Sequence, residues 1–381
     1  MKIRSLKLKD RNFGEQWSKE VEHRWNYDDF LRRKEWKEDW ISFDGVVYHR
    51  PTQRVYCGIT SFAGDIFKAY DIARGEFVDL GFQHVGDKYD AKFHRSMELT
   101  RDGKSLFVAT ALLHDIDRYF DAPGGSIYRH DIASGKTQKL CTPIPHCYIQ
   151  SIALDERRGL IYSMHFTPEY LSRYDVNSGK TKILGLIGSG ITFGQGENLV
   201  IDDDGCVWSG WTATRAWQSS PGPDACRLCK YDPHEDRMHF FSRGLPRADG
   251  EYGNSRVEGL FDLGTGCLYA SAGNGSLYRL NPRTGECVLL GTPIADRRSR
   301  LTSLLRHKDG FAYGITGRDG ECRLLRFDIH REKYELGDAI IDSSGVAMYQ
   351  CHDITITPEG VLYAGENDHP QRSSYLWEIT L

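Results

Sequence analysis

The sequence lacks any run of eighteen apolar residues, so no segment has the length and hydrophobicity of a transmembrane helix. It also lacks an excess of positive charge, because 49 Lys and Arg against 53 Asp and Glu leave a net charge of −4. No basic field is therefore available to attract nucleic acid or an anionic membrane. The basic start MKIRSLKLKDRNF is not followed by the apolar core of a secretory signal. We expect an ordinary soluble, cytoplasmic protein that has neither nucleic acid nor membrane as a partner.

The ten cysteines are scattered singly through apparent strands. In a large chain without a secretory signal, this distribution favours reduced cysteines that act as small core residues. One set, Cys226, Cys229, His234 and His239, has a spacing that resembles a zinc site. Residues three apart in a strand point to opposite faces, however, so core cysteines are the favoured interpretation and zinc is the alternative.

One phrase recurs along the chain: a strand that ends in an aromatic residue and Asp, a short turn, and a second strand. The Asp or its equivalent stands at Asp71, Asp131, Asp175, Asp232, Asn281, Asp328 and Thr380. The intervals are 60, 44, 57, 49, 47 and 52 residues, and a second hairpin with Asp-Gly or similar punctuation precedes each phrase. Units of about fifty residues with four strands are typical of propeller blades.

The last unit lacks its fourth strand, and the isolated segment KIRSLKL at the start of the chain can supply it. Such closure would protect both sheet edges. The predicted fold is therefore all-β, a seven-bladed β-propeller closed by an N-terminal strand that completes the last blade. We expect one domain over residues 1–381. Residues 13–40, with four tryptophans and dense charge, form a partly helical excursion that serves as a structural plug or a partner contact.

Two histidines flank one of the predicted hairpins. Residues equidistant from a hairpin turn lie opposite each other, and His94 and His114 are symmetric about position 104. Both are therefore expected at the open end of their blade, near the central channel where propeller ligands bind. The same construction predicts that one rim gathers His94, His114, Tyr148, His165, Trp211, Arg215, Arg256, Arg300 and His352.

These residue types suit one kind of chemistry better than others. Glycoside hydrolysis usually needs two carboxylates, and no evident pair stands on the predicted rim. β-Elimination from a uronic acid needs a cation for the C6 carboxylate, a base for the C5 proton and an acid for the leaving O4. Histidine can serve as the base, tyrosine as acid or base, and arginine as the bidentate carboxylate ligand.

The segments KFHRSMEL, LLHDIDRYFDAPGGSIYRHD, PHCYIQSIALD and GWTATRAW resemble the propeller-type polysaccharide lyases. The nearest are the ulvan lyases and the L-rhamnose-α-1,4-D-glucuronate lyases, and the blade pattern extends the likeness over nearly the whole chain. The resemblance implies that His94 and His114 are the histidine pair, Tyr148 the catalytic tyrosine and Arg215 a substrate-binding arginine. One position departs: where these families place an arginine sixteen residues after the tyrosine, this chain has Met164 and then His165.

The sequence therefore predicts a lyase that cleaves uronate-containing oligosaccharides, with His94, His114, Tyr148 and Arg215 as catalytic residues. The predicted substrate-binding residues are His165, Trp211, Arg256, Arg300 and His352. The chemistry requires no cofactor, although the resemblance leaves open a structural calcium or zinc ion, and His352 leaves open a cation at the channel. The alternatives are a metal-dependent sugar lactonase or hydrolase and a non-catalytic carbohydrate-binding propeller.

Overall fold

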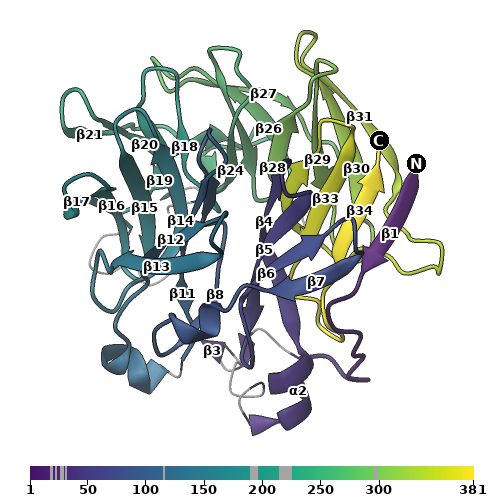
Figure 1. Cartoon of the computed structure of the whole chain (residues 1–381). Helices are drawn as coiled ribbons and strands as arrows, with labels where there is room; N and C mark the ends of the chain where they lie inside the picture. Colours follow the sequence, from purple (N-terminus) through teal and green to yellow (C-terminus); the bar gives the residue numbers. More distant parts are fainter. Residues whose placement is uncertain are drawn as a thin grey trace. The chain divides into compact units, whose positions relative to one another are not determined.

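The structure is a computed structural model that describes residues 1–17, 20–21, 24–25, 30, 32–114, 116–188, 196–213, 225–295 and 299–381. The chain forms two compact units: unit 1 comprises Met1–Ile149 and Ile341–Leu381, and unit 2 comprises Gln150–Ile340. Three blades belong to unit 1 and four to unit 2, which makes the fold the predicted seven-bladed β-propeller (Figure 1). Within the described ranges, every helix is too short or too polar to span a bilayer.

Unit 1 contains three antiparallel sheets. The first blade is β4 (Ile41–His49), β5 (Arg54–Ser61), β6 (Phe67–Asp71) and β7 (Glu76–Asp79), extended by β8 (Asp90–Lys92) and β11 (Ala111–Leu112). The second is β9 (Met97–Leu99), β10 (Ser105–Ala109), β12 (Ile127–Asp131) and β13 (Lys136–Cys141). The seventh is β32 (Cys351–Ile356), β33 (Val361–Glu366), β34 (Leu376–Thr380) and β1 (Lys2–Leu6). The short 3-10 helices η1 (Phe82–His84) and η2 (Ile116–Asp121) lie between strands.

Unit 2 contains the four consecutive blades in the middle of the chain. Blade 3 is β14 (Tyr148–Asp155), β15 (Leu160–Phe166), β16 (Glu169–Asp175) and β17 (Lys180–Gly188), and blade 4 is β18 (Val200–Ile201), β19 (Val207–Trp211), β20 (Arg227–Asp232) and β21 (Arg237–Phe240). Blade 5 is β24 (Val257–Asp262), β25 (Leu268–Ala272), β26 (Leu277–Leu280) and β27 (Cys287–Gly291), and blade 6 is β28 (Leu301–Arg306), β29 (Phe311–Thr316), β30 (Arg323–Asp328) and β31 (Lys333–Ala339). The strands β22 (Leu245–Pro246) and β23 (Asn254–Ser255) form a separate two-stranded ribbon.

The N-terminal strand closes the seventh blade, as predicted. β1 pairs antiparallel with β34 over five residues, from Lys2 opposite Thr380 to Leu6 opposite Leu376. Arg4 reinforces the pairing through a 2.6 Å contact with Glu378 on the facing strand. The edge of β34 that the last blade would otherwise expose is therefore covered by the chain's own beginning.

The recurring Asp of the sequence phrase, or Asn281 in blade 5, begins the outer turn of blades 1 to 6. Asp175 shows the reason for its recurrence, because one carboxylate oxygen accepts the backbone N–H groups of Asn177 and Ser178. The backbone N–H of Gly179, at φ +69°, then bonds the carbonyl of Asp175 at 2.8 Å. The same turn recurs with glycine at the fourth position after Asp71, Asp131 and Asn281, whereas Asp236 and Glu332 occupy this left-handed position in the remaining two blades with a full turn.

Several first strands of the blades carry a β-bulge near their start. In β4 the pairing with β5 shifts register between Phe43 and Gly45, so Asp44 is the extra residue. The equivalent shifts in β24 and β32 make Glu258 and His352 the extra residues. Bulges re-aim the side chain that they carry. Asp44, Glu258 and His352 therefore have no directly opposite partner on the neighbouring strand, and their side chains depart from the regular alternation of the strand.

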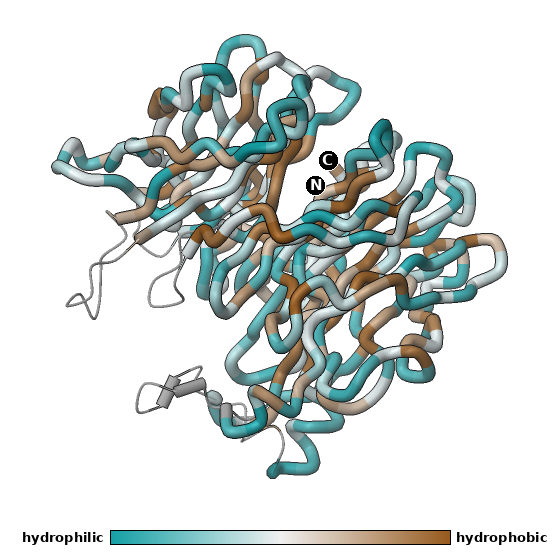
Figure 2. Tube along the Cα trace, turned by 90° about the vertical axis from the view of Figure 1, so that its left-hand side faces the viewer, coloured by the Kyte–Doolittle hydropathy of each residue, from teal (hydrophilic) through white to brown (hydrophobic). Residues whose placement is uncertain are grey.

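The blades are held together by apolar side chains packed within each unit. In unit 1, Phe67, Phe82 and Phe93 pack edge to face and are at most 2% exposed. In unit 2, Trp208 stacks on Phe241 and lies in the cluster that includes Leu260 and Tyr278. Figure 2 shows the hydrophobic segments along the strands and hydrophilic residues at many of the turns. Each fully buried side chain of this size contributes about 1.5–3 kcal/mol.

The N-terminal excursion contains the helix α2 (Lys34–Asp39) and the short strands β2 (Glu20–Val21) and β3 (Arg24–Trp25). Its side chains Trp17, Phe30, Trp36 and Trp40 form a buried aromatic cluster of their own. The indole N–H groups of Trp17 and Trp40 both donate to the backbone carbonyl of His369, at 3.2 Å. The excursion is thus tied to the loop that follows β33 in the same unit.

Candidate functional site

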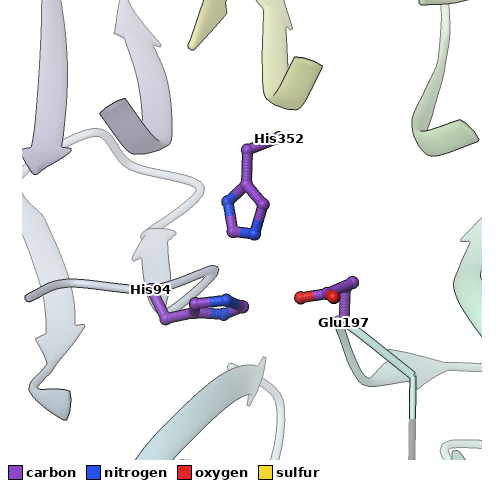
Figure 3. Close-up of side chains that lie close together, drawn as sticks. All are labelled: His94, Glu197 and His352. Carbon is purple, nitrogen blue, oxygen red and sulfur yellow. The ribbon is translucent and has the colours of Figure 1, made fainter. Parts of the chain in front are cut away.

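Two histidines that are far apart in sequence meet in unit 1. The rings of His94 and His352 pack edge to face, with centroids 4.4 Å apart and planes at 82° (Figure 3). A ring nitrogen of one lies within 4.8 Å of a ring nitrogen of the other. Both side chains are buried, at 6% and 1% exposure. His352 stands in the bulge of β32, and His94 lies between β8 and β9.

The tautomer of His352 is set by the backbone. Its Nδ1 lies 2.7 Å from the carbonyl oxygen of Asp44, an atom that can only accept, so Nδ1 carries the proton. In the neutral ring, Nε2 then holds the lone pair. The Asp44 carboxylate is fully buried and accepts from Thr60 Oγ1 at 2.5 Å and from Lys92 Nζ at 2.9 Å. We refer to Asp44, Lys92, His94 and His352 as the histidine cluster.

The position of His94 depends on a close approach of two backbones. A Cβ atom on Gly45 would lie 2.9 Å from the carbonyl oxygen of His94, and one on Gly58, which pairs with Gly45, would lie 2.6 Å from the Cβ of Phe93. Only glycine leaves room for the segment that carries His94 to pack on the sheet at these two positions.

His114 lies beside a different aromatic residue from the one that the hairpin symmetry predicts. β10 pairs with β9 only as far as the bond from Ala109 N to Ser96 O. The chain then crosses to β8, where Ala111 faces Lys92, and a register shift follows between Ala111 and Leu112. His114 consequently contacts Tyr89, at 5.3 Å between ring centroids, whereas His94 contacts His352.

Tyr148 is the first residue of β14 and is half-buried. Its neighbour Ile149 donates its backbone N–H to the carbonyl of Thr110 at 3.1 Å. Thr110 is followed by β11 and His114, so the backbone at the start of β14 lies beside the chain that leads into His114. Its role as the acid stays a prediction.

A second polar cluster occupies the starts of the first strands in unit 2. Arg300 donates from Nε to Glu258 at 2.6 Å and from Nη2 to Glu197 at 3.1 Å. Gln150 Nε2 donates to the other oxygen of Glu197 at 3.2 Å, and Arg256 Nη2 lies 3.9 Å from Glu197. The backbone N–H of Glu197 also donates to the Glu258 carbonyl at 2.7 Å. We refer to Gln150, Glu197, Arg256, Glu258 and Arg300 as the arginine–glutamate cluster.

This cluster corrects the prediction that the rim has no pair of carboxylates. Glu197 and Glu258 are 8% and 5% exposed and share the guanidinium of Arg300. A faint signal stood in the sequence, because Asp44 and Glu258 each precede a glycine within an otherwise apolar strand start, as FDG and VEG. Both carboxylates are engaged by a cation, so neither resembles the free acid and base of a glycoside hydrolase.

Two of the predicted substrate-binding residues are held by the protein itself. His165 is completely buried, its Nε2 lies 2.8 Å from Ser172 Oγ, and burial lowers its pKa to about 3. It is therefore neutral at physiological pH, which argues against a role in holding a carboxylate. Trp211 donates its indole N–H to the carbonyl of Phe241 at 3.0 Å and packs on Phe240. Arg215 lies outside the described residues.

The residues of the zinc pattern lie in separate environments. Cys226 and Cys229 are buried, and burial raises the pKa of the Cys229 thiol far above its ordinary value. His234 Nε2 lies 2.8 Å from Arg158 Nη2. His239 instead approaches Asp232 and Glu235 in the outer turn of blade 4, with ligand atoms within 4.8 Å of one another. All ten cysteines are free thiols.

Glu98, in the strand β9 that follows His94, is a further acidic residue of unit 1. The pKa of Glu98 is raised to about 8, chiefly by burial and also by the Asp353 carboxylate, while the Arg95 guanidinium opposes the shift. Arg95 is itself 3.6 Å from Asp353. Unit 1 therefore contains a carboxyl group that remains protonated up to neutral pH.

No family model matches this sequence, and no curated protein matches it either. Solved structures do match. The chain is 12% identical to an inactive histidine-to-alanine variant of virginiamycin B lyase from Staphylococcus aureus with quinupristin, covering 90% of this chain and 95% of that one with a TM-score of 0.62. It is 11% identical to the WD40 repeats of RRP9, covering 90% and 94% with a TM-score of 0.60.

A third match is the extracellular domain of a protein from B. thetaiotaomicron described as a hybrid two-component system, at 14% identity and a TM-score of 0.58. It covers 89% of this chain, and this chain spans 38% of that longer one. At these identities the likeness shows the propeller fold alone, which enzymes and WD40 proteins share.

Proposed function

We propose that this protein is a carbon–oxygen lyase that cleaves uronate-containing oligosaccharides by β-elimination, with the histidine cluster transferring the proton. The observation that carries the proposal is the contact between His94 and His352, in which the backbone of Asp44 fixes the tautomer of one ring. Two buried imidazoles in contact can transfer a proton. Neither the packing of the core nor the pairing of the strands requires histidines at these two positions.

The reaction divides into two proton movements. His352 Nε2 takes the proton from C5 of the uronate, the C5–H electron pair forms the C4–C5 double bond, and the C4–O4 bond breaks. O4 leaves with a proton from Tyr148, the acid that the sequence predicts. The Asp44 carboxylate, 3.8 Å from His352 Nδ1, offsets the charge of the imidazolium that forms on His352, and His94 lies in contact with the same ring. The roles of His114, Arg215, Arg256 and Arg300 stay predictions.

The test is the appearance of the unsaturated uronyl product. The protein is incubated with ulvan, alginate, polygalacturonate and hyaluronan, and the conjugated double bond is followed by its ultraviolet absorbance. We expect product with at least one polymer and a loss of at least about 100-fold in His94→Gln and in His352→Gln. His330→Gln, an exposed histidine in the outer turn of blade 6, is the matched control and should retain full rate. Absence of product from all four polymers, or full rate in both cluster variants, would refute the proposal.

The same contact favours a second candidate, a metal-dependent lactonase or hydrolase. A histidine whose Nδ1–H donates to a backbone carbonyl presents Nε2 as metal-binding histidines do. Titration calorimetry with Zn²⁺, Mn²⁺ and Ca²⁺ separates the candidates. Stoichiometric binding that disappears in His352→Gln, together with activity lost to a chelator and restored by the ion, would favour the metal enzyme over the lyase.

A further inference from the structure

Unit 1 carries a continuous line of aromatic rings that no catalytic step above uses. Tyr89 contacts His114, His114 contacts Tyr119, and Tyr119 contacts Phe120, with centroids 5.3, 6.2 and 5.1 Å apart. Phe120 in turn contacts His146 at 5.5 Å. We refer to Tyr89, His114, Tyr119, Phe120 and His146 as the aromatic stripe.

The stripe ends in an exposed ring. The side chain of Phe120 is 80% exposed, although it stands in the ordered 3-10 helix η2 and touches two other rings. A single exposed apolar ring needs no explanation, but Phe120 adjoins two other rings, and contiguous apolar surface of this kind marks ligand-binding sites. The companions of Phe120 are tyrosine and histidine, which combine a flat apolar face with a polar edge.

The backbone holds two members of the stripe in an unfavourable conformation. Tyr89 has φ +73° and His146 has φ +65°, in the left-handed region that bulky side chains rarely adopt. The His146 ring is fixed by its Nδ1, which donates to the carbonyl of Ala122 at 2.7 Å. Local strain of this kind persists where the surrounding structure needs a side chain in one place, and it clusters at ligand sites.

The charge at the other end of the stripe indicates what it binds. The ammonium group of Lys88 lies 4.5 Å from the centroid of the Tyr89 ring, so the stripe combines a cation with flat aromatic faces. A sugar ring offers an apolar C–H face to an aromatic ring and hydroxyl groups to its polar edges, and a uronate adds a carboxylate for the lysine. An acidic oligosaccharide therefore complements the stripe better than a neutral sugar or an apolar peptide does.

The stripe is joined to the histidine cluster by one short strand. Tyr89 precedes β8, Lys92 ends it, and His94 follows two residues later. At about 3.3 Å per residue the backbone between Tyr89 and His94 spans at most about 16 Å, which is longer than one sugar ring. We infer that the aromatic stripe is a binding subsite for the non-reacting sugars of an acidic oligosaccharide whose reacting uronate lies at the histidine cluster. The assignment of the reacting end rests on the proposed function.

The inference is tested by chain length. Calorimetry measures the affinity of disaccharides and tetrasaccharides prepared from the four uronate polymers, with neutral cellotetraose as the charge control. Phe120→Ala should weaken tetrasaccharide binding about tenfold and leave disaccharide binding within about twofold. Lys88→Gln should weaken the acidic tetrasaccharide and not cellotetraose. Tyr252→Ala removes a tyrosine that is 100% exposed and is the matched control without an effect.

Kinetics separate the two proposals. If product forms, Phe120→Ala should raise KM for tetrasaccharides with kcat unchanged. Length-dependent binding without product would retain the subsite and refute the lyase. Product formation with unchanged tetrasaccharide affinity and KM in Phe120→Ala would refute the subsite alone. An equal loss in Tyr252→Ala, or conversion of a dimer to a monomer by Phe120→Ala without a change in sugar affinity, would also overturn the inference.

Discussion

The histidine cluster of unit 1 and the arginine–glutamate cluster of unit 2 are built by the same local device and differ in charge. Bulges place Asp44 and His352 in the first cluster and Glu258 in the second. In the first, a buried carboxylate is satisfied by Thr60 and Lys92, and two imidazoles remain in contact with each other. In the second, the two carboxylates share one guanidinium.

This contrast in charge indicates which cluster is suited to proton transfer. A carboxylate held by an arginine strongly favours its ionised form and changes its protonation reluctantly. In the histidine cluster, by contrast, the backbone carbonyl of Asp44 holds the Nδ1–H of His352, which leaves Nε2 with a lone pair that can accept a proton. We therefore expect substitutions in the arginine–glutamate cluster to act mainly on stability and those in the histidine cluster to act mainly on turnover.

The strongest predicted consequence is a loss of stability when Arg300 in unit 2 is replaced. Arg300→Leu removes the cation and leaves two buried carboxylates, so the free energy of unfolding should fall by about 3–5 kcal/mol. Thermal and urea unfolding measure the loss. Arg331→Leu, which removes an arginine side chain that is 81% exposed, should change stability by less than about 0.5 kcal/mol. Equal stability of Arg300→Leu and wild type would contradict the comparison.

The next effect concerns turnover in unit 1. Gln in place of His352 retains an N–H for the Asp44 carbonyl but removes the proton acceptor. The rate of product formation should fall about 100-fold, equivalent to about 2.7 kcal/mol in the activation barrier. The free energy of unfolding should fall less in His352→Gln than in Arg300→Leu. A variant that is as unstable as Arg300→Leu and still turns over at the wild-type rate would reverse the assignment of roles.

The stability of the protein should depend on pH through Glu98, the acidic residue of β9. The pKa of Glu98 is about 8 in the folded chain and close to 4.5 when unfolded, so the folded state retains the proton over this range. Its stabilising contribution is present below pH 4.5 and is lost as pH rises towards 8. Glu98→Gln should therefore gain stability relative to wild type between pH 5 and pH 8. Urea unfolding at several pH values measures the gain, and parallel curves for the two proteins would contradict it.

The weakest predicted effect concerns a type of turn that occurs in both units. Gly135 in unit 1 and Gly179 in unit 2 occupy the same turn position at φ +67° and +69°, and an added Cβ would meet nothing within 4 Å. Gly135→Ala and Gly179→Ala should each lose about 1 kcal/mol through backbone strain alone. Thermal unfolding would contradict this account if only one of the two turns were affected.

Much of the fold could be predicted because its signals are local. The Asp-initiated outer turns, the glycines that follow them and the alternation of the hairpins all act within a few residues, so they could be recognised along the chain. The pairing of β1 with β34 was also predictable, since a blade short of one strand leaves an edge that a leftover strand can cover. The placement of His352 at its strand start followed from the same hairpin counting.

The errors arose where a bulge or a crossing altered the register. His114 was expected opposite His94, but the chain leaves β10 after Ala109 and pairs with β8, which brings His114 to Tyr89. His165 was placed at the correct end of its strand, but distance from a turn does not tell which face a side chain occupies, and this one faces the interior. Glu197 was not selected, because its partners Gln150 and Arg300 are distant in sequence.

The number of blades, the form of their outer turns and the strand that closes the last blade could all be recognised along the chain, since these features depend on contacts between neighbouring residues and on a repeated length. Three contacts became known only from the folded chain: His94 meets His352, Arg300 joins Glu197 to Glu258, and Phe120 lies exposed at the end of the aromatic stripe. These contacts join residues from different blades or loops. One-residue register shifts at Asp44, Glu258 and His352 determine which way those side chains point. A one-residue slip leaves almost no trace in composition or periodicity, yet it turns a side chain to the opposite face of its sheet.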